Sequence, residues 1–133
     1  MQIALKPEHW EKMLVHVQAH APLEACGLLA GRKSFVEDVL LIENEARSPN
    51  RFRMDPKQQL KAFHWMQSNG LELIGIFHSH PAGLETPSER DIAEAAYPVI
   101  QVIWSQTVGR WSARAFWIGN EQAREVTLQL VDK

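Results

Sequence analysis

The stretch Leu71-Glu72-Leu73-Ile74-Gly75-Ile76-Phe77-His78-Ser79-His80-Pro81 determines how the rest of the chain folds. Leu71 to Phe77 is an apolar run of strand length, which is typical of a buried central strand. His78 and His80 follow where this strand would leave the core. Because side chains two positions apart project from the same face of a strand, the two imidazoles can converge on one metal ion.

A catalytic metal site usually has three protein ligands and one position left for water, so a third ligand is needed. Asp91 is the natural candidate, because a helix that begins at Ser88 would place it in the first turn, close to the loop after His80. An ion held by two neutral imidazoles and one carboxylate would lower the pKa of a bound water toward about 7. The pattern therefore predicts a hydrolytic metal site.

Hydrolysis also needs a group that takes a proton from the water and passes it to the leaving amine. A carboxylate that is not itself a ligand suits this role, and Glu24 is the candidate. It begins the segment Glu24-Ala25-Cys26-Gly27, whose small residues would allow the backbone to approach a neighbouring strand closely.

The remaining pattern predicts an α/β fold with a mixed β-sheet and about three helices. The first helix follows Pro7 and ends at Pro22, with an apolar stripe formed by Trp10, Met13, Leu14 and Val17. The second helix has a capping-box-like start at Asp55, Pro56 and Gln58 and ends at Gly70, with a buried face formed by Leu60, Phe63 and Met66. The third helix runs from Ser88 toward Pro98. Further strands are expected at 3–5, 24–30, 35–42, 99–104, 111–118 and 125–131, with 24–30 and 35–42 forming a hairpin.

The composition is that of one packed domain over residues 1–133, with 45% hydrophobic and 23% charged residues. A formal net charge of -2 offers no electrostatic surface for nucleic acid or an anionic membrane. We expect neither a signal peptide nor a membrane span, which favours the cytoplasm. The single cysteine, Cys26, excludes an intramolecular disulfide and paired-cysteine zinc sites, so a metal must have nitrogen and oxygen ligands.

The residues discussed so far lie in four places: Pro22-Leu23-Glu24-Ala25-Cys26-Gly27, His78-Ser79-His80-Pro81, Ser88 and Asp91. Together they resemble the JAMM motif of the MPN-plus (MPN+) metalloprotease family. The resemblance covers nearly the whole chain, including the order of strands and helices. It implies a single MPN-like (cytidine-deaminase-like) domain with Zn²⁺ on His78, His80 and Asp91. It also implies that Glu24 is the acid/base catalyst and that the Ser88 hydroxyl helps to stabilise the tetrahedral oxyanion.

The same resemblance implies hydrolysis of a peptide or isopeptide bond after the C-terminal Gly-Gly of a ubiquitin-like protein. The chain has little room for the inserted segments that hold ubiquitin in eukaryotic members, so it is more similar to the compact prokaryotic type, some of which trim sulfur-carrier proteins. A narrow slot beside the metal would admit Gly-Gly and exclude bulkier residues. Whether the chain forms a homodimer stays open.

Several residues have simpler interpretations. Ser88-x-x-Asp91 is also an ordinary helix-capping box, and both roles can hold together. We expect His16 and His20 to face solvent and His9 and His64 to be surface or edge residues. Ser79 is expected to be structural and Cys26 to be an inert buried thiol. The competing function is a non-catalytic MPN-type scaffold, although every ligand position is filled. A zinc deaminase is excluded because it needs paired cysteines.

Overall fold

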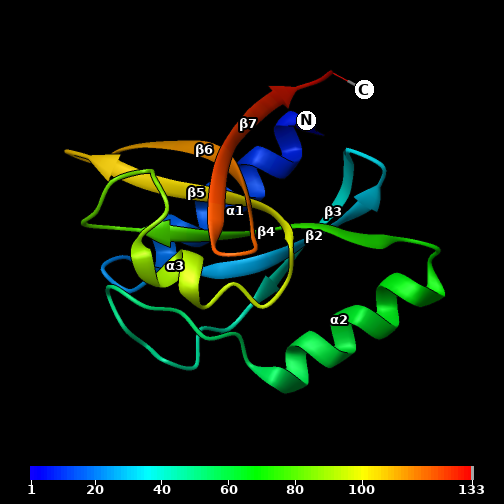
Figure 1. The fold of residues 1–133 in the computed structure, drawn as a ribbon, viewed down its shortest axis with the longest axis horizontal. Coiled ribbons are helices and arrows are strands. Elements are labelled where there is room, and N and C mark those ends of the chain that lie inside the picture. Colours follow the sequence, from blue (N-terminus) through cyan, green and yellow to red (C-terminus); the bar gives the residue numbers. More distant parts are fainter. Residues whose placement is uncertain (133) are drawn as a thin grey trace.

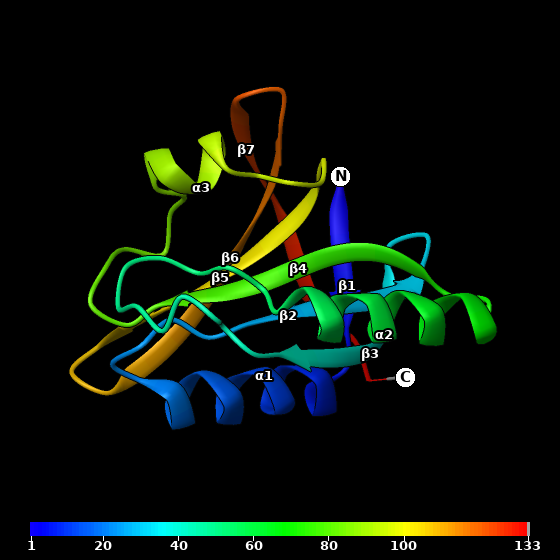
Figure 2. The ribbon, with the colours of Figure 1, turned by 90° about the horizontal axis from the view of Figure 1, so that it is seen from below.

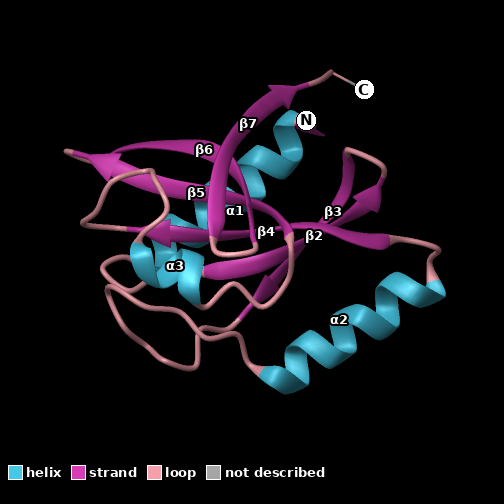
Figure 3. Cartoon of the chain, viewed as in Figure 1, coloured by secondary structure: helices cyan, strands magenta, loops and turns pink. Residues whose placement is uncertain are grey.

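Strand β4 (Glu72–His80) lies at the centre of the sheet, as its apolar sequence predicts. In the computed structural model, which describes residues 1–132, β4 pairs antiparallel with β2 (Cys26–Arg32) along one edge and parallel with β5 (Val99–Thr107) along the other. The strand is buried from Gly75 to His80. Figures 1 and 3 show β4 running through the middle of the molecule.

The other strands extend the sheet in both directions until it closes. β3 (Phe35–Ile42) forms the predicted antiparallel hairpin with β2, and β6 (Arg110–Gly119) and β7 (Gln122–Leu130) follow β5 antiparallel. β1 (Gln2–Leu5) pairs in parallel with β7 and, at Ala4, with Phe35 of β3. The mixed sheet is confirmed, and its closure into a seven-stranded barrel in the order β1-β3-β2-β4-β5-β6-β7 is an additional finding.

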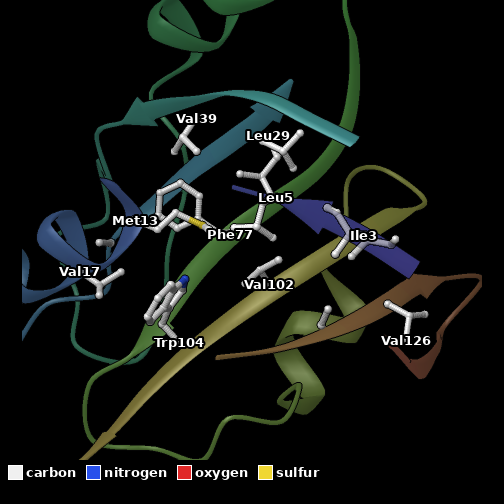
Figure 4. Close-up of a cluster of buried hydrophobic side chains, with 14 residues drawn as sticks. Ile3, Leu5, Met13, Val17, Leu29, Val39, Phe77, Val102, Trp104 and Val126 are labelled. Atoms are coloured by element: carbon white, nitrogen blue, oxygen red, sulfur yellow. The ribbon is translucent and has the colours of Figure 1, made fainter. Parts of the chain in front are cut away.

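Successive side chains of β4 point to opposite faces of the sheet. A different helix covers each of these faces. Phe77 faces the cluster that α1 (Pro7–His20) completes with Met13 and Val17, as Figure 4 shows. Burying each of these side chains contributes about 1.5–3 kcal/mol. Ile76 faces a second cluster under α2 (Pro56–Ser68), which lies apart from α1 in Figure 2.

Helix α2 departs from its predicted contacts. It buries Ala62 and Met66, whereas Leu60 is 59% exposed, so the expected burial of Leu60 was wrong. Ala62 and Met66 are four residues apart and form a narrow stripe, and they are the buried residues of α2 within the described chain. Asp55 caps the helix as predicted, but the Gln58 side chain accepts a hydrogen bond from the Glu43 backbone nitrogen instead of completing a capping box.

Helices α1 and α3 also contain corrections. His9 is 7% exposed rather than a surface residue, because its Nδ1 accepts a hydrogen bond from the Lys6 backbone nitrogen at the start of α1. His16 is half-buried, and its Nε2 donates to the carbonyl of Cys26. α3 (Glu89–Ala93) begins after Ser88 as expected but ends at Ala93, well before Pro98, since Glu94 is already its C-cap. None of the helices within residues 1–132 has the length and apolar character that crossing a membrane requires.

Gly27 tests the predicted close approach of β2 to its neighbours. A Cβ atom there would lie 2.2 Å from Cε1 of Phe77 and 2.6 Å from the Leu40 carbonyl oxygen. We expect Gly27→Ala to lower the free energy of unfolding by about 3 kcal/mol through overpacking. At Gly109 no atom of the described chain lies within 4 Å of an added methyl group, so Gly109→Ala should cost only about 1 kcal/mol, from its left-handed backbone. Urea unfolding measures both, and equal losses would contradict this account.

Candidate metal centre

The two histidines of β4 meet at the carboxyl end of the strand. His78 and His80 share the face of β4 that carries Ile76, and their Nε2 atoms are 3.1 Å apart. His78 is fully buried and His80 is 8% exposed. Ser79 between them ties β4 to the neighbouring segment, since its Oγ accepts a hydrogen bond from the Ala25 backbone nitrogen and its own nitrogen donates to the Ala25 carbonyl.

The start of α3 brings Asp91 to the histidines. Its Oδ2 lies 2.9 Å from Nε2 of His80 and 3.2 Å from Nε2 of His78. The same oxygen accepts a hydrogen bond from the Ser88 backbone nitrogen, and Ser88 Oγ accepts one from the Asp91 nitrogen. Ser88 is therefore the N-cap of the helix and also holds Asp91 in place, while its hydroxyl proton stays available for donation.

Glu24 lies next to this trio, just before β2 begins at Cys26. One of its carboxylate oxygens and one ring nitrogen from each of His78 and His80 lie within 4.8 Å of one another. Glu24 is only 3% exposed, and its Oε1 has no hydrogen-bond partner among the described residues. The structure thus gathers all five residues of the motif at one end of the central strand.

Neighbouring groups fix how the imidazoles face the cluster. Because His80 Nδ1 donates to the Leu84 carbonyl oxygen at 2.6 Å, Nε2 is the ring nitrogen that faces Asp91. When protonated, Nε2 donates to the Asp91 carboxylate, and when that proton is lost its lone pair is available to an ion. The ring of Phe52 stacks on His78 with centroids 4.5 Å apart and an interplanar angle of 22°. Phe52 belongs to the loop between β3 and α2, whose role the sequence pattern does not indicate.

The pKa values of the two carboxyl groups are shifted in opposite directions. Burial opposes the ionisation of Asp91, but hydrogen bonds with His78 and His80 outweigh it, and the pKa of Asp91 lies well below its usual range. Burial raises the pKa of Glu24 to about 8, against the opposing influence of His80. Near neutral pH, Asp91 is therefore an anion bound to the histidines, whereas Glu24 binds a proton in the absence of a nearby cation.

This donor set fits a divalent cation. A tetrahedral site with bonds of about 2.0–2.1 Å places its ligand atoms about 3.3 Å apart, and the three atoms here are 2.9 to 3.2 Å apart. Cys26, beside His78 in the sheet, does not take part. Burial raises the pKa of its thiol to about 12, in keeping with the inert role expected for it.

A groove of about 330 Å³ leads away from Asp91 across the surface. One wall is formed by residues 51–54 of the β3–α2 loop, and the other by α3 and the segment up to Tyr97. Ile76 and Gln101 lie at its floor, where Gln101 Oε1 is buried and unpaired within residues 1–132. No motif in the sequence indicates this groove, because its walls come from segments far apart in the chain.

The cluster contains two histidines and two carboxyl groups, one of which binds a proton much more tightly than the other, and it lies beside a groove. These features place it in the class of metal-dependent hydrolytic sites. Residues 6–130 match the family Prok-JAB, described as prokaryotic homologs of the JAB domain. The chain belongs to this family, which confirms the resemblance to the JAMM/MPN+ metalloproteases.

Individual relatives are similar over most of their length. The chain is 34% identical over 126 residues to the desampylase of Pyrococcus furiosus, covering 94% of this chain and 87% of the relative. It is 40% identical over 119 residues to the probable TtuB-protein conjugate cleaving protease of Thermus thermophilus, covering 89% and 76%. The solution structure of a protein from Desulfitobacterium hafniense, 35% identical, superposes with a TM-score of 0.90 over 100% of this chain and 94% of that one.

A bound divalent ion should stabilise the fold, because its ligands converge only in the folded chain. At an ion concentration of about a hundred times Kd, we expect the free energy of unfolding to rise by about 2.7 kcal/mol. His78→Ala should lose most of this gain, whereas His16→Ala, a half-buried histidine outside the cluster, should keep it. Thermal unfolding with and without a chelator measures both. A full gain in His78→Ala would show that the ion binds elsewhere.

Proposed function

We propose that this protein is a zinc-dependent peptidase that hydrolyses a peptide or isopeptide bond after the C-terminal Gly-Gly of a ubiquitin-like or sulfur-carrier protein. The observation that carries the proposal is the convergence of three potential ligand atoms within 3.2 Å, with the protonatable Glu24 beside them. The names of the Pyrococcus and Thermus relatives support this choice of reaction and substrate.

His78, His80 and Asp91 would hold the ion. Glu24 with the two histidines could also share one, but Asp91 is nearer to both rings and is ionised. Nitrogen and oxygen ligands of this kind suit zinc, which commonly binds two histidines and one carboxylate in hydrolases. When bound, the ion supplies Lewis-acid chemistry that polarises the scissile carbonyl and activates water near neutral pH.

The other residues move protons and stabilise charge. Glu24 takes a proton from the attacking water and then gives it to the nitrogen of the departing amine. Glu24 must be ionised to take this proton, and a divalent cation bound nearby would favour the ionised form. Burial raises its pKa, which then favours the protonated form that passes the proton to the amine. The Ser88 hydroxyl, which uses only its oxygen to cap α3, donates to the oxyanion of the tetrahedral intermediate.

The groove beside Asp91 would receive the C-terminal tail of the substrate. A volume of about 330 Å³ accommodates several residues of an extended chain. Glycine at the last two positions allows the tail backbone to lie close to the buried cluster, where a side chain would meet the walls. Phe52 and Tyr97 supply apolar surface along the groove.

The alternative function, a non-catalytic scaffold, is disfavoured by the complete set of polar groups buried at the site. A scaffold gains nothing from a buried Glu24 Oε1 that has no hydrogen-bond partner in the part of the chain that the structure describes, because burying it costs free energy. The expected cytoplasmic location and a homodimeric state stay predictions.

Loss of the acid/base group should separate catalysis from metal binding. We expect Glu24→Ala to keep about one zinc per chain and to lose at least about a hundredfold in rate. Glu72→Ala, the same change at the exposed start of β4, should leave both unchanged. Metal analysis and initial rates measure the two properties. An active Glu24→Ala variant would exclude Glu24 as the proton carrier.

The substrate proposal is tested with sulfur-carrier proteins extended beyond Gly-Gly. Incubation with the purified protein should release a product ending in Gly-Gly, identified by mass spectrometry, and a chelator should stop the reaction. A matched substrate with Ala-Ala at these positions should be cut at least about tenfold more slowly, because its methyl groups meet the groove. Equal cleavage of the two substrates would refute the proposed slot.

A further inference from the structure

Glu24 is held by the loop between β3 and α2, residues 43–55, rather than by the sheet. Strand β2 starts two residues later, at Cys26. The Glu24 backbone nitrogen donates to the Ser48 carbonyl at 2.9 Å, and its carbonyl oxygen accepts a hydrogen bond from Nδ2 of Asn44 at 3.0 Å. Both main-chain polar groups of Glu24 are therefore bonded to this one loop, which sets where its side chain begins.

Asn44 is the centre of that loop. It is 6% exposed, and its Nδ2 also donates to the Arg51 carbonyl at 3.0 Å. Its Oδ1 accepts hydrogen bonds from the backbone nitrogens of Ala46 and Arg53. The side chain thus makes four hydrogen bonds, two as donor and two as acceptor, which uses the full capacity of a carboxamide. Aspartate could replace only the acceptor half, and serine only one donor.

The bonds from Asn44 reach both sides of the site. Arg51 and Arg53 flank Phe52, whose ring stacks on His78 and lines the groove. The buried carboxamide of Asn44 therefore fixes the backbone of Glu24 and also the segment whose Phe52 ring lies against His78. A displacement of about 1 Å in a catalytic group costs on the order of a hundredfold in rate, so this anchoring bears directly on catalysis.

We infer that Asn44 is a positioning residue of the active site, which fixes Glu24 and the groove wall in one arrangement. The inference rests on the proposed role of Glu24. Asn44 lies outside the JAMM motif, in a segment whose sequence predicts only a loop. Its action is indirect, since its hydrogen bonds are to main-chain atoms and to neither the reacting bond nor the ion.

Asn44→Asp isolates this role, because it keeps the acceptor for Ala46 and Arg53 and removes the donors to Glu24 and Arg51. We expect kcat on a substrate cleaved by the wild type to fall roughly ten- to a hundredfold, with zinc content unchanged. Asn69→Asp, which removes a similar side-chain donor at the exposed end of α2, is the matched control and should keep full activity.

A double-mutant cycle distinguishes positioning from general support of the loop. In the Glu24→Ala background, Asn44→Asp should lower the residual kcat by less than about twofold, since the proton carrier that it positions is gone, and its effect on the groove wall should appear in KM. An equal loss in both backgrounds, or full activity of Asn44→Asp, would overturn the inference. If Asn44→Asp does not fold, the same cycle on Asn44→Ser decides by the same criteria.

Amide hydrogen exchange gives a readout that does not depend on activity. The Glu24 amide should exchange at least about tenfold faster in Asn44→Asp, whereas the Ala25 amide, bonded to Ser79 Oγ, should keep its rate. Unchanged exchange at Glu24 would contradict the positioning role. A wild type that cleaves nothing, or an active Glu24→Ala, would instead refute the proposed function, so the two failures are distinguishable.

Discussion

The short separation between two imidazole nitrogens and one carboxylate oxygen is the constraint that the rest of the structure satisfies. Buried polar groups of this kind are costly unless each has a partner. The fold supplies these partners from separate elements. The Leu84 carbonyl orients His80, and the Ser88 cap orients Asp91. The Ser79 hydroxyl accepts a hydrogen bond from the backbone nitrogen of Ala25, the residue after Glu24. Strand β4 provides the common axis, because its two-residue period places both histidines on the same face.

Features encoded in short segments could be predicted from the sequence. The apolar run into His78, the hairpin of β2 and β3 and the Ser88 cap each depend on residues close together in the chain, and the structure has all three. The proximity of Glu24, His78, His80, Ser88 and Asp91 followed from the motif alone. The expectations for Leu60 and His9 were wrong for different reasons: α2 packs on the sheet through the narrower stripe of Ala62 and Met66, which leaves Leu60 exposed, and His9 is buried where it accepts a hydrogen bond at the start of α1.

The groove and the role of Asn44 were beyond such reasoning for a related physical cause. The hydrogen bonds of Asn44 link residues up to twenty positions away, and the groove walls come from the β3–α2 loop and from α3 with the segment after it. Proton affinity was equally hidden, since Glu24 and Asp91 have the same chemical group and differ only in their surroundings. In this protein the sequence identifies the side chains that gather at the site, whereas long-range contacts determine their different proton affinities.

The barrel is sealed by strands from opposite ends of the described chain, with Ile3 aligned to Leu128. During synthesis on the ribosome, β1 emerges first but must wait for β7 before that seam can form. Contacts of such long sequence separation slow folding, and until they form the edge of β1 offers free hydrogen-bonding groups to other chains. A nascent fragment that ends before β7 therefore contains all of the site residues but lacks the closed barrel.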